Sequence, residues 1–241
     1  MKSICMIAHR GYSARYLQNT ELAFIKAAEH GSGGAETDIR VTRDGVLVCS
    51  HNAEAVLQDG TELQVAQSTY AQLTAQPLRN LKTQDEAYLC TFERYLEIMK
   101  EHDMICFIEL KGVFTDAQEK QVMDTIERVY DISRCILQSF QFDNLIRIHQ
   151  AYPSLPLMFT YGTAQRDYER CFDYGFSIDA DQYVMTEKMV EDFHAHGLSV
   201  GVWTCNTLES LERCRALGVD YIESDVFGGK NEEWAMRGED K

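Results

Sequence analysis

The sequence predicts a closed barrel of eight parallel β-strands alternating with α-helices, the (β/α)8 or TIM barrel of the α/β class. Three observations favour this fold. Eight short apolar runs recur along the chain, the segments between them carry helix signals, and the chain has 241 residues. Runs with little polar alternation are typical of strands buried on both faces, and barrels of this kind commonly have about 250 residues.

The expected strands are short and rich in apolar and β-branched residues. They comprise residues 3–9, 34–42, 104–110, 135–140, 156–161, 176–181, 198–204 and 219–225. The second and third strands lie much further apart than later neighbours do, which predicts a short insertion after the second strand, at about residues 50–90. No Ser/Gly-rich or Pro-rich stretch marks a linker, so we expect one domain over residues 1–241.

Polar caps and stop residues indicate where the helices begin and end. Thr115 and Gln118 form a capping-box pattern before apolar residues at helical spacing. Thr186 precedes a second segment of this kind, and Thr207 precedes a third that stops at Gly218. Because helices with these signals lie between the strands, a closed barrel is favoured over an open sheet.

Composition restricts the classes of partner. The formal net charge is −15 and no basic stripe is visible, which argues against a nucleic-acid partner. The eight cysteines form no C-x-x-C pair, so we expect buried free thiols and a cytoplasmic location. No apolar run is long enough for a transmembrane segment, and the first residues read directly into a strand. The oligomeric state is left open.

Residues that can carry chemistry occur near the ends of nearly all the expected strands, where a barrel places its active site. They are His9, Arg10, Glu36, Asp38, Glu109, Lys111, Ser139, Asp179, Asp181, Trp203, Asn206, Ser224 and Asp225. Glu36 and Asp38 are two positions apart and project to one face, and Glu109 lies near the end of the next strand. Converging carboxylates repel one another unless a cation lies between them, and hard divalent ions such as Mg²⁺ or Ca²⁺ suit oxygen ligands. The alternative is salt bridges with nearby basic side chains, which are Arg40, Arg43 and Lys111.

Two histidines, His9 and His51, are the candidate acid and base. Imidazole is suited to proton transfer near neutral pH. A lone histidine at a strand end is more often structural, but His9 is followed by Arg10 and Gly11. Because arginine matches phosphate oxygens and glycine lets backbone approach a ligand closely, this pattern favours a site that binds phosphate.

The first part of the chain resembles the signature region of the glycerophosphodiester phosphodiesterase family. The family opens with His-Arg-Gly, continues with Asn-Thr before a helix, Glu-x-Asp on the second strand and T-x-D-G, and then has a histidine. The corresponding residues here are 9–11, 19–20, 36–38, 42–45 and 51. Further on, "FIELK", "LQSF", "VWTCN" and "GVDYIESD" also match in order, so the resemblance covers almost the whole chain.

The resemblance implies a reaction and a role for nine residues. The reaction is the metal-dependent hydrolysis of a small glycerophosphodiester to sn-glycerol 3-phosphate and an alcohol. Glu36, Asp38 and Glu109 would bind the divalent metal. His9 and His51 would be the acid/base pair. The substrate-binding residues would be Arg10 and Lys111 at the phosphate, with Phe140 and Trp203 lining the glycerol and leaving-group side.

Two departures from the family pattern leave alternatives open. The family's Glu-Asn-Thr begins with Gln18 here, and its His-Asp pair ends with Asn52, so two acidic residues are missing. Such a chain could act on lysophospholipids, as a lysophospholipase D does, or could bind a phosphodiester without cleaving it. Sequence also does not distinguish attack by water from attack by the glycerol 2-hydroxyl through a cyclic phosphate. An enolase-type barrel would explain the carboxylates but not the two histidines.

Overall fold

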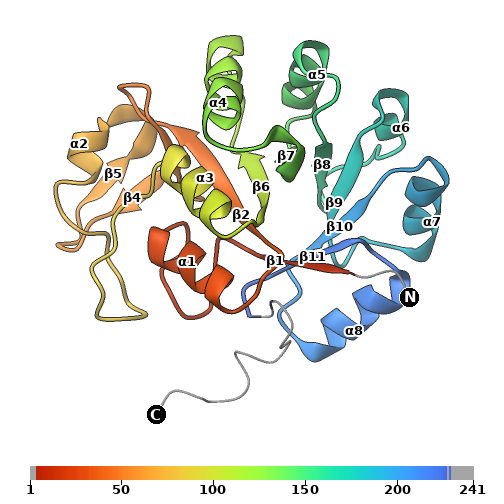
Figure 1. The fold of residues 1–241 in the computed structure, drawn as a ribbon, viewed down its shortest axis with the longest axis horizontal. Helices are drawn as coiled ribbons and strands as arrows, with labels where there is room; N and C mark the ends of the chain where they lie inside the picture. Colours follow the sequence, from red (N-terminus) through yellow and green to blue (C-terminus); the bar gives the residue numbers. More distant parts are fainter. Residues whose placement is uncertain (1–3, 227, 229–241) are drawn as a thin grey trace.

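The computed structural model describes residues 4–226 and 228 and confirms the TIM barrel. Parallel strands pair in the order β1-β11-β10-β9-β8-β7-β6-β2, and pairing of β1 with β2 closes the barrel (Figure 1). All eight strands lie in the regions expected from the sequence. Their bounds are β1 (Cys5–Ala8), β2 (Gly34–Val41), β6 (Ile105–Leu110), β7 (Cys135–Ser139), β8 (Leu157–Tyr161), β9 (Ser177–Asp181), β10 (Val200–Trp203) and β11 (Tyr221–Ser224).

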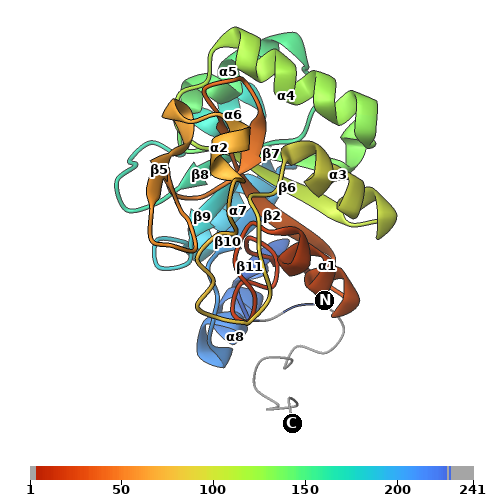
Figure 2. The same cartoon turned by 90° about the vertical axis from the view of Figure 1, so that its left-hand side faces the viewer.

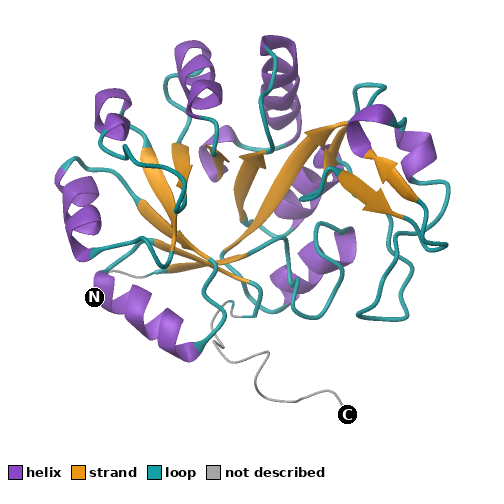
Figure 3. Ribbon diagram, turned by 180° about the vertical axis from the view of Figure 1, so that it is seen from behind, coloured by secondary structure: helices purple, strands orange, loops and turns teal. Residues whose placement is uncertain are grey.

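Helices surround the strands on the outside of the barrel (Figure 3). They are α1 (Glu21–Glu29), α3 (Phe92–Glu101), α4 (Asp116–Val129), α5 (Phe142–Ala151), α6 (Arg170–Tyr174), α7 (Glu187–Ala195) and α8 (Leu208–Leu217), with a 3-10 turn η2 (Ile132–Arg134) before β7. Thr115 caps α4 and forms the expected capping box with Gln118, while Thr207 caps α8, which ends at Gly218. None of the helices in the described part of the chain is both long and apolar enough to span a membrane.

The insertion after β2 has structure of its own and lies beside the barrel (Figures 1 and 2). It begins with β3 (Leu47–Cys49), which pairs antiparallel with β2. An antiparallel hairpin of β4 (Glu54–Val56) and β5 (Glu62–Gln64) follows, then a 3-10 turn η1 (Val65–Gln67) and a short helix α2 (Tyr70–Leu73). Its small apolar cluster contains Val48, Ala55, Val65, Leu73 and Leu89.

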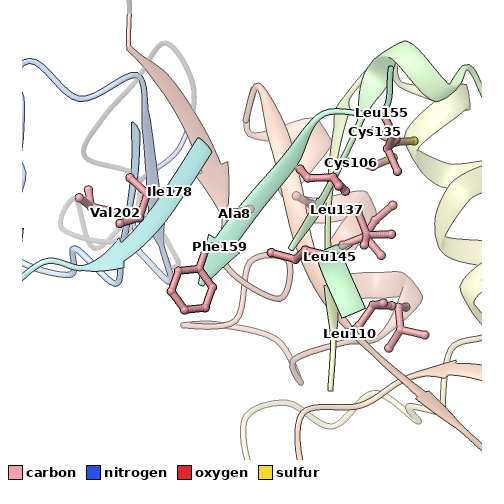
Figure 4. Packing of buried hydrophobic residues seen from close by; sticks show 14 of the residues in the cluster. Ala8, Cys106, Leu110, Cys135, Leu137, Leu145, Leu155, Phe159, Ile178 and Val202 are labelled. Carbon is pink, nitrogen blue, oxygen red and sulfur yellow. The ribbon is translucent and has the colours of Figure 1, made fainter. Parts of the chain in front are cut away.

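Two apolar clusters divide the barrel. The larger lies between strands and helices and includes Leu137, Phe159 and Val202 (Figure 4). Burial of such a side chain contributes about 2 kcal/mol. The smaller contains Ile7, Phe107, Ile136 and Met158, which alternate along their strands with residues of the outer cluster and therefore point inward. The interior is thus apolar toward the N-terminal strand ends and leaves the C-terminal ends for polar groups.

Candidate active site

The turn after β1 positions the first candidate residues. Arg10 and Gly11 both have positive φ, 57° and 77°, so the chain reverses immediately after His9. A Cβ atom at Gly11 would lie 2.7 Å from the backbone carbon of Ala23, so α1 can pack this closely only against glycine. The turn leaves the Arg10 N–H free to donate a 3.0 Å hydrogen bond to Glu36 Oε2.

His9 is paired with a carboxylate from the other end of the chain. Its Nδ1 lies 2.7 Å from Asp225 Oδ1, which also accepts a 2.7 Å hydrogen bond from Ser13 Oγ. Asn206 Nδ2 donates to Asp225 Oδ2 at 2.6 Å. Burial opposes ionisation of Asp225, but the hydrogen bonds from His9, Ser13 and Asn206 outweigh it and lower the pKa of the carboxyl. Since a carboxylate only accepts, Nδ1 carries the proton and Nε2 is the ring nitrogen left for a substrate.

Glu36, Asp38 and Glu109 converge as expected. One carboxylate oxygen from each lies within 4.8 Å of the others, and all three side chains are buried. Glu36 Oε1 has no hydrogen-bond partner within the described residues. Burial, with Asp38 and Glu223 nearby, raises the pKa of Glu36 well above its usual value, and burial also raises the pKa of Glu109 to about 7. Three oxygen donors with an unpartnered atom among them fit a hard divalent cation.

Two basic side chains neutralise part of this charge. Lys111 Nζ lies 2.9 Å from Asp38 Oδ1 and 2.8 Å from Glu109 Oε1, and Arg10 Nε lies 3.1 Å from Asp38 Oδ2. Burial opposes ionisation of Asp38, but Lys111 and Arg10 together outweigh it and lower its pKa. Of the three basic side chains considered as salt-bridge partners of the carboxylates, Lys111 therefore forms such salt bridges. Arg10 NH1 also donates a 2.9 Å hydrogen bond to Gln18 Oε1, at a position where the family has a carboxylate.

Arg40 and Arg43 turn away from the carboxylates. Arg43 donates to the side chain of Gln72, and Arg40 donates to the backbone oxygen of His51 at 2.7 and 3.2 Å. Arg40 thereby holds the segment after β3, which carries His51, at the barrel mouth. His51 Nδ1 lies 2.9 Å from Asn52 Oδ1. Burial lowers the pKa of His51; the hydrogen bond to Asn52 opposes this shift and the charge of Arg10 adds to it.

One cavity of about 150 Å³ joins these groups at the C-terminal ends of the strands. Seven of the nine predicted residues line it: His9, Arg10, His51, Glu109, Lys111, Phe140 and Trp203. The Phe140 and Trp203 rings pack edge to face, with centroids 5.8 Å apart. The other two predicted residues, Glu36 and Asp38, do not line the cavity but contact lining residues: Glu36 bonds to Arg10, and Asp38 pairs with Arg10 and Lys111.

The remaining four wall residues were not among the predicted site residues. They are Gln138, Thr160, Asp179 and Glu223. Each lies on a barrel strand and is almost fully buried. Sequence signals for them existed: Gln138 and Glu223 lie in the motifs "LQSF" and "GVDYIESD", and Asp179 lies near an expected strand end. Thr160 lies two positions after the inward-facing Met158, so strand alternation predicts that it also points inward.

The arrangement resembles known proteins in both sequence and fold. A model of the glycerophosphoryl diester phosphodiesterase family matches residues 9–228. The chain belongs to this family. It is accordingly a phosphoric diester hydrolase by family, which agrees with the resemblance read from its motifs.

Relatives and solved structures cover most of the chain. The glycerophosphodiester phosphodiesterase of Caldanaerobacter subterraneus subsp. tengcongensis is 27% identical over 93% of this chain and 95% of its own length. A glycerophosphodiester phosphodiesterase structure from Parabacteroides distasonis superimposes with a TM-score of 0.78 at 24% identity, covering 93% and 94% of the two chains. A phosphodiesterase from Oleispira antarctica, solved with the product sn-glycerol-3-phosphate, gives 0.79 at 18% identity over 92% of each chain. Both structures share the barrel fold.

Proposed function

We propose that this protein hydrolyses glycerophosphodiesters to sn-glycerol 3-phosphate and an alcohol. One observation carries the proposal: three carboxylates, two basic side chains and two histidines meet at one cavity at the barrel mouth. A related barrel binds sn-glycerol-3-phosphate as its product, which supports the same product here. A local positive charge from Arg10 and Lys111 is what an anionic substrate requires on a protein with a net charge of −15.

Glu36, Asp38 and Glu109 would hold a divalent metal, Mg²⁺ or Ca²⁺. When bound, such an ion neutralises charge that develops on the phosphoryl oxygens. Arg10 and Lys111 would bind the remaining phosphoryl oxygens, since each already lies at the edge of the carboxylate group. Lys111 would exchange part of its contact with Asp38 and Glu109 for the substrate.

The two histidines would divide the proton transfers. His51 has a lowered pKa and a neutral partner, so it is uncharged near neutral pH and would accept the proton of the nucleophile. His9 has the charged partner Asp225, which stabilises an imidazolium, so it would protonate the leaving alkoxide. The nucleophile is water or the glycerol 2-hydroxyl. Phe140 and Trp203 would exclude water on the glycerol and leaving-group side.

Cysteine usage supports a cytoplasmic location as part of this proposal. All eight cysteines are free thiols, and the sulfur atoms of Cys205 and Cys214 lie 3.5 Å apart without a covalent bond. Thiols this close persist in a reducing compartment.

The deciding experiment measures glycerol 3-phosphate release from a panel of glycerophosphodiesters and one lysophospholipid, in EDTA, Mg²⁺ or Ca²⁺. Release should require a divalent metal, and Glu109→Gln should reduce kcat by about 10²–10³-fold or more because it removes a charged ligand. Glu127→Gln, an exposed change on α4, is the matched control and should keep full activity.

Two results would redirect the proposal. Release from the lysophospholipid alone would favour the lysophospholipase D-type activity. No release under any metal, from folded protein that still binds a phosphodiester, would favour a non-catalytic binding barrel.

A further inference from the structure

Two buried carboxylates in the cavity have no role in the proposed reaction. Asp179 on β9 has none of its surface exposed, and neither of its oxygens has a hydrogen-bond partner among the residues described. Glu223 on β11, Glu36 and Glu109 are acidic neighbours that interact with it. A Cβ atom at Gly201 would lie 2.6 Å from Asp179 Oδ1, so β10 accommodates this carboxylate only because it has glycine there. The carboxylate is thus built into the barrel wall.

Neutral oxygen atoms beside these carboxylates also lack partners. Gln138 on β7 and Thr160 on β8 are 1% and 2% exposed and line the same cavity. Gln138 Nε2 donates to Glu223 Oε1 at 3.3 Å, yet its Oε1 and the Thr160 hydroxyl bond to nothing else in residues 4–226. Buried polar atoms without partners cost about 1–3 kcal/mol each, and such atoms commonly mark a bound ion or water. They point to an occupant independently of the acidic side chains.

The spacing of the ligand atoms matches a metal ion. His9, Glu36 and Glu223 each offer an atom within 4.8 Å of the other two. Hard divalent cations hold their ligands at about 2.0–2.6 Å, so atoms on opposite sides of one ion lie about 4–5 Å apart. Glu36 belongs both to this group and to the group formed with Asp38 and Glu109. A carboxylate shared in this way is typical of sites that bind two metal ions about 4 Å apart.

The charge in the cavity is not balanced by a single metal. Five buried carboxylates surround it, and two basic side chains, Arg10 and Lys111, contact them. With all five carboxylates ionised, as metal binding favours, one divalent ion leaves one negative charge in excess and a second leaves one positive charge. The cavity can therefore hold a second ion without a large excess of positive charge.

We propose that the barrel holds a second divalent cation between His9, Glu36 and Glu223, with Asp179, Gln138 and Thr160 as its further oxygen donors or support. The inference rests on the proposed function only in that Glu36 is shared with the proposed catalytic metal. Because an ion bound to His9 prevents proton transfer by that imidazole, the second site inhibits the reaction when it fills. The enzyme is then active at low and inhibited at high metal concentration.

Equilibrium dialysis against Mn²⁺ tests the site without any substrate. We expect two ions per wild-type chain, one per chain for Glu223→Gln or Glu109→Gln, and none for Glu36→Gln, which removes the shared ligand. Glu127→Gln should bind two. Thermal melting of each variant establishes that it is folded, and Asp179→Asn provides a second, isosteric test, with weakened binding of one ion only. Electron paramagnetic resonance should show magnetic coupling between the two ions.

Specific results would overturn the inference. One is a wild-type chain that binds only one ion, and another is a Glu223→Gln variant that binds as many ions as wild type. Either result would mean that protons, or the hydroxyls of a bound polyol, satisfy the buried polar groups of the proposed second site instead. Turnover should fall over the Mn²⁺ range that fills the second site, and not in Glu223→Gln. Undiminished turnover with both sites full would overturn the assignment of His9 as a ligand. If no glycerol 3-phosphate is ever released, the proposed function fails, while the count of bound ions still decides the second site.

Discussion

At the scale of single residues, the two histidines differ in their partners. His9 faces the charged carboxylate of Asp225, whereas His51 faces the neutral amide of Asn52. A carboxylate favours the imidazolium form, and an amide does not. In the proposed mechanism, the acidic residue missing beside His51 leaves the reaction class unchanged, because His9 keeps a carboxylate partner. The family departure at Asn52 is consistent with the division of roles proposed for the two histidines.

Asp225→Asn should lower kcat by about 10²–10⁴-fold, with little change in KM. The amide can still bond to His9 Nδ1, but it no longer stabilises the imidazolium and permits the wrong tautomer. Steady-state kinetics on glycerophosphodiesters measure the effect, and Asp124→Asn on the exposed face of α4 is the control. An Asp225→Asn enzyme with wild-type kcat would show that His9 needs no charged partner.

Asn52→Asp should raise the pKa of His51, because a carboxylate beside an imidazole favours its charged form. Since His51 must be uncharged to accept a proton, the acidic limb of the kcat/KM profile should move upward by about one pH unit. Asn52→Ala removes the hydrogen bond without adding charge and should not move the limb upward. A profile unchanged in Asn52→Asp would mean that the limb reports another group.

The pairing of His9 with Asp225 was not predicted, although both residues lie near expected strand ends. The two residues are 216 positions apart, and only closure of the barrel brings β1 beside β11. The nine predicted site residues could be named because family motifs fix them one by one. In the polar wall, Gln138 and Glu223 lie within matched motifs but were given no role, and Thr160 and Asp179 lie outside the matched motifs.

At the scale of elements, local signals predicted most of the fold. Strand runs and caps such as Thr115 with Gln118 act within a few residues, so the sequence contains them in full. The antiparallel strand β3 and the β4–β5 hairpin were not foreseen. Each strand is three residues long and depends on pairing, and residues 54–56 and 62–64 show no apolar alternation long enough to detect.

The turn between β1 and α1 should be the element most sensitive to a single methyl group. Gly11→Ala combines a positive φ with a Cβ atom 2.7 Å from the Ala23 backbone, so we expect a loss of about 2–4 kcal/mol of stability. Gly45→Ala has a similar φ of +83° but open space, and should cost about 1 kcal/mol. Urea unfolding of both variants measures the difference. Equal losses would show that α1 moves to accept the methyl group.

At the scale of the whole molecule, the barrel concentrates unfavourable charge in its polar half. Burial is the main cause that raises the pKa of Glu223 well above its usual value, and the negative charge of the neighbouring Asp179 adds to it. Burial likewise raises the pKa of Asp179 well above its usual value. The apolar half, with Ile7 and Phe107 at its centre, must supply the stability that these groups remove. This is the general pattern of a site that is preorganised at a cost to the fold.

The loss of stability caused by burying Glu223 should grow as the pH rises. Glu223 has a raised pKa in the folded state, so above pH ~4 the unfolded chain releases its proton while the folded protein keeps it, and stability falls as pH rises. Glu223→Gln keeps the shape and cannot ionise. In EDTA, its melting temperature should therefore equal that of wild type near pH 4 and exceed it increasingly toward pH 8. Each unit of raised pKa that pH passes corresponds to about 1.4 kcal/mol. Glu127→Gln, which is exposed, should show no such trend. A constant difference between Glu223→Gln and wild type across this range would mean that Glu223 is already ionised in the folded protein, and that its neighbours, rather than a retained proton, carry the cost of burying it.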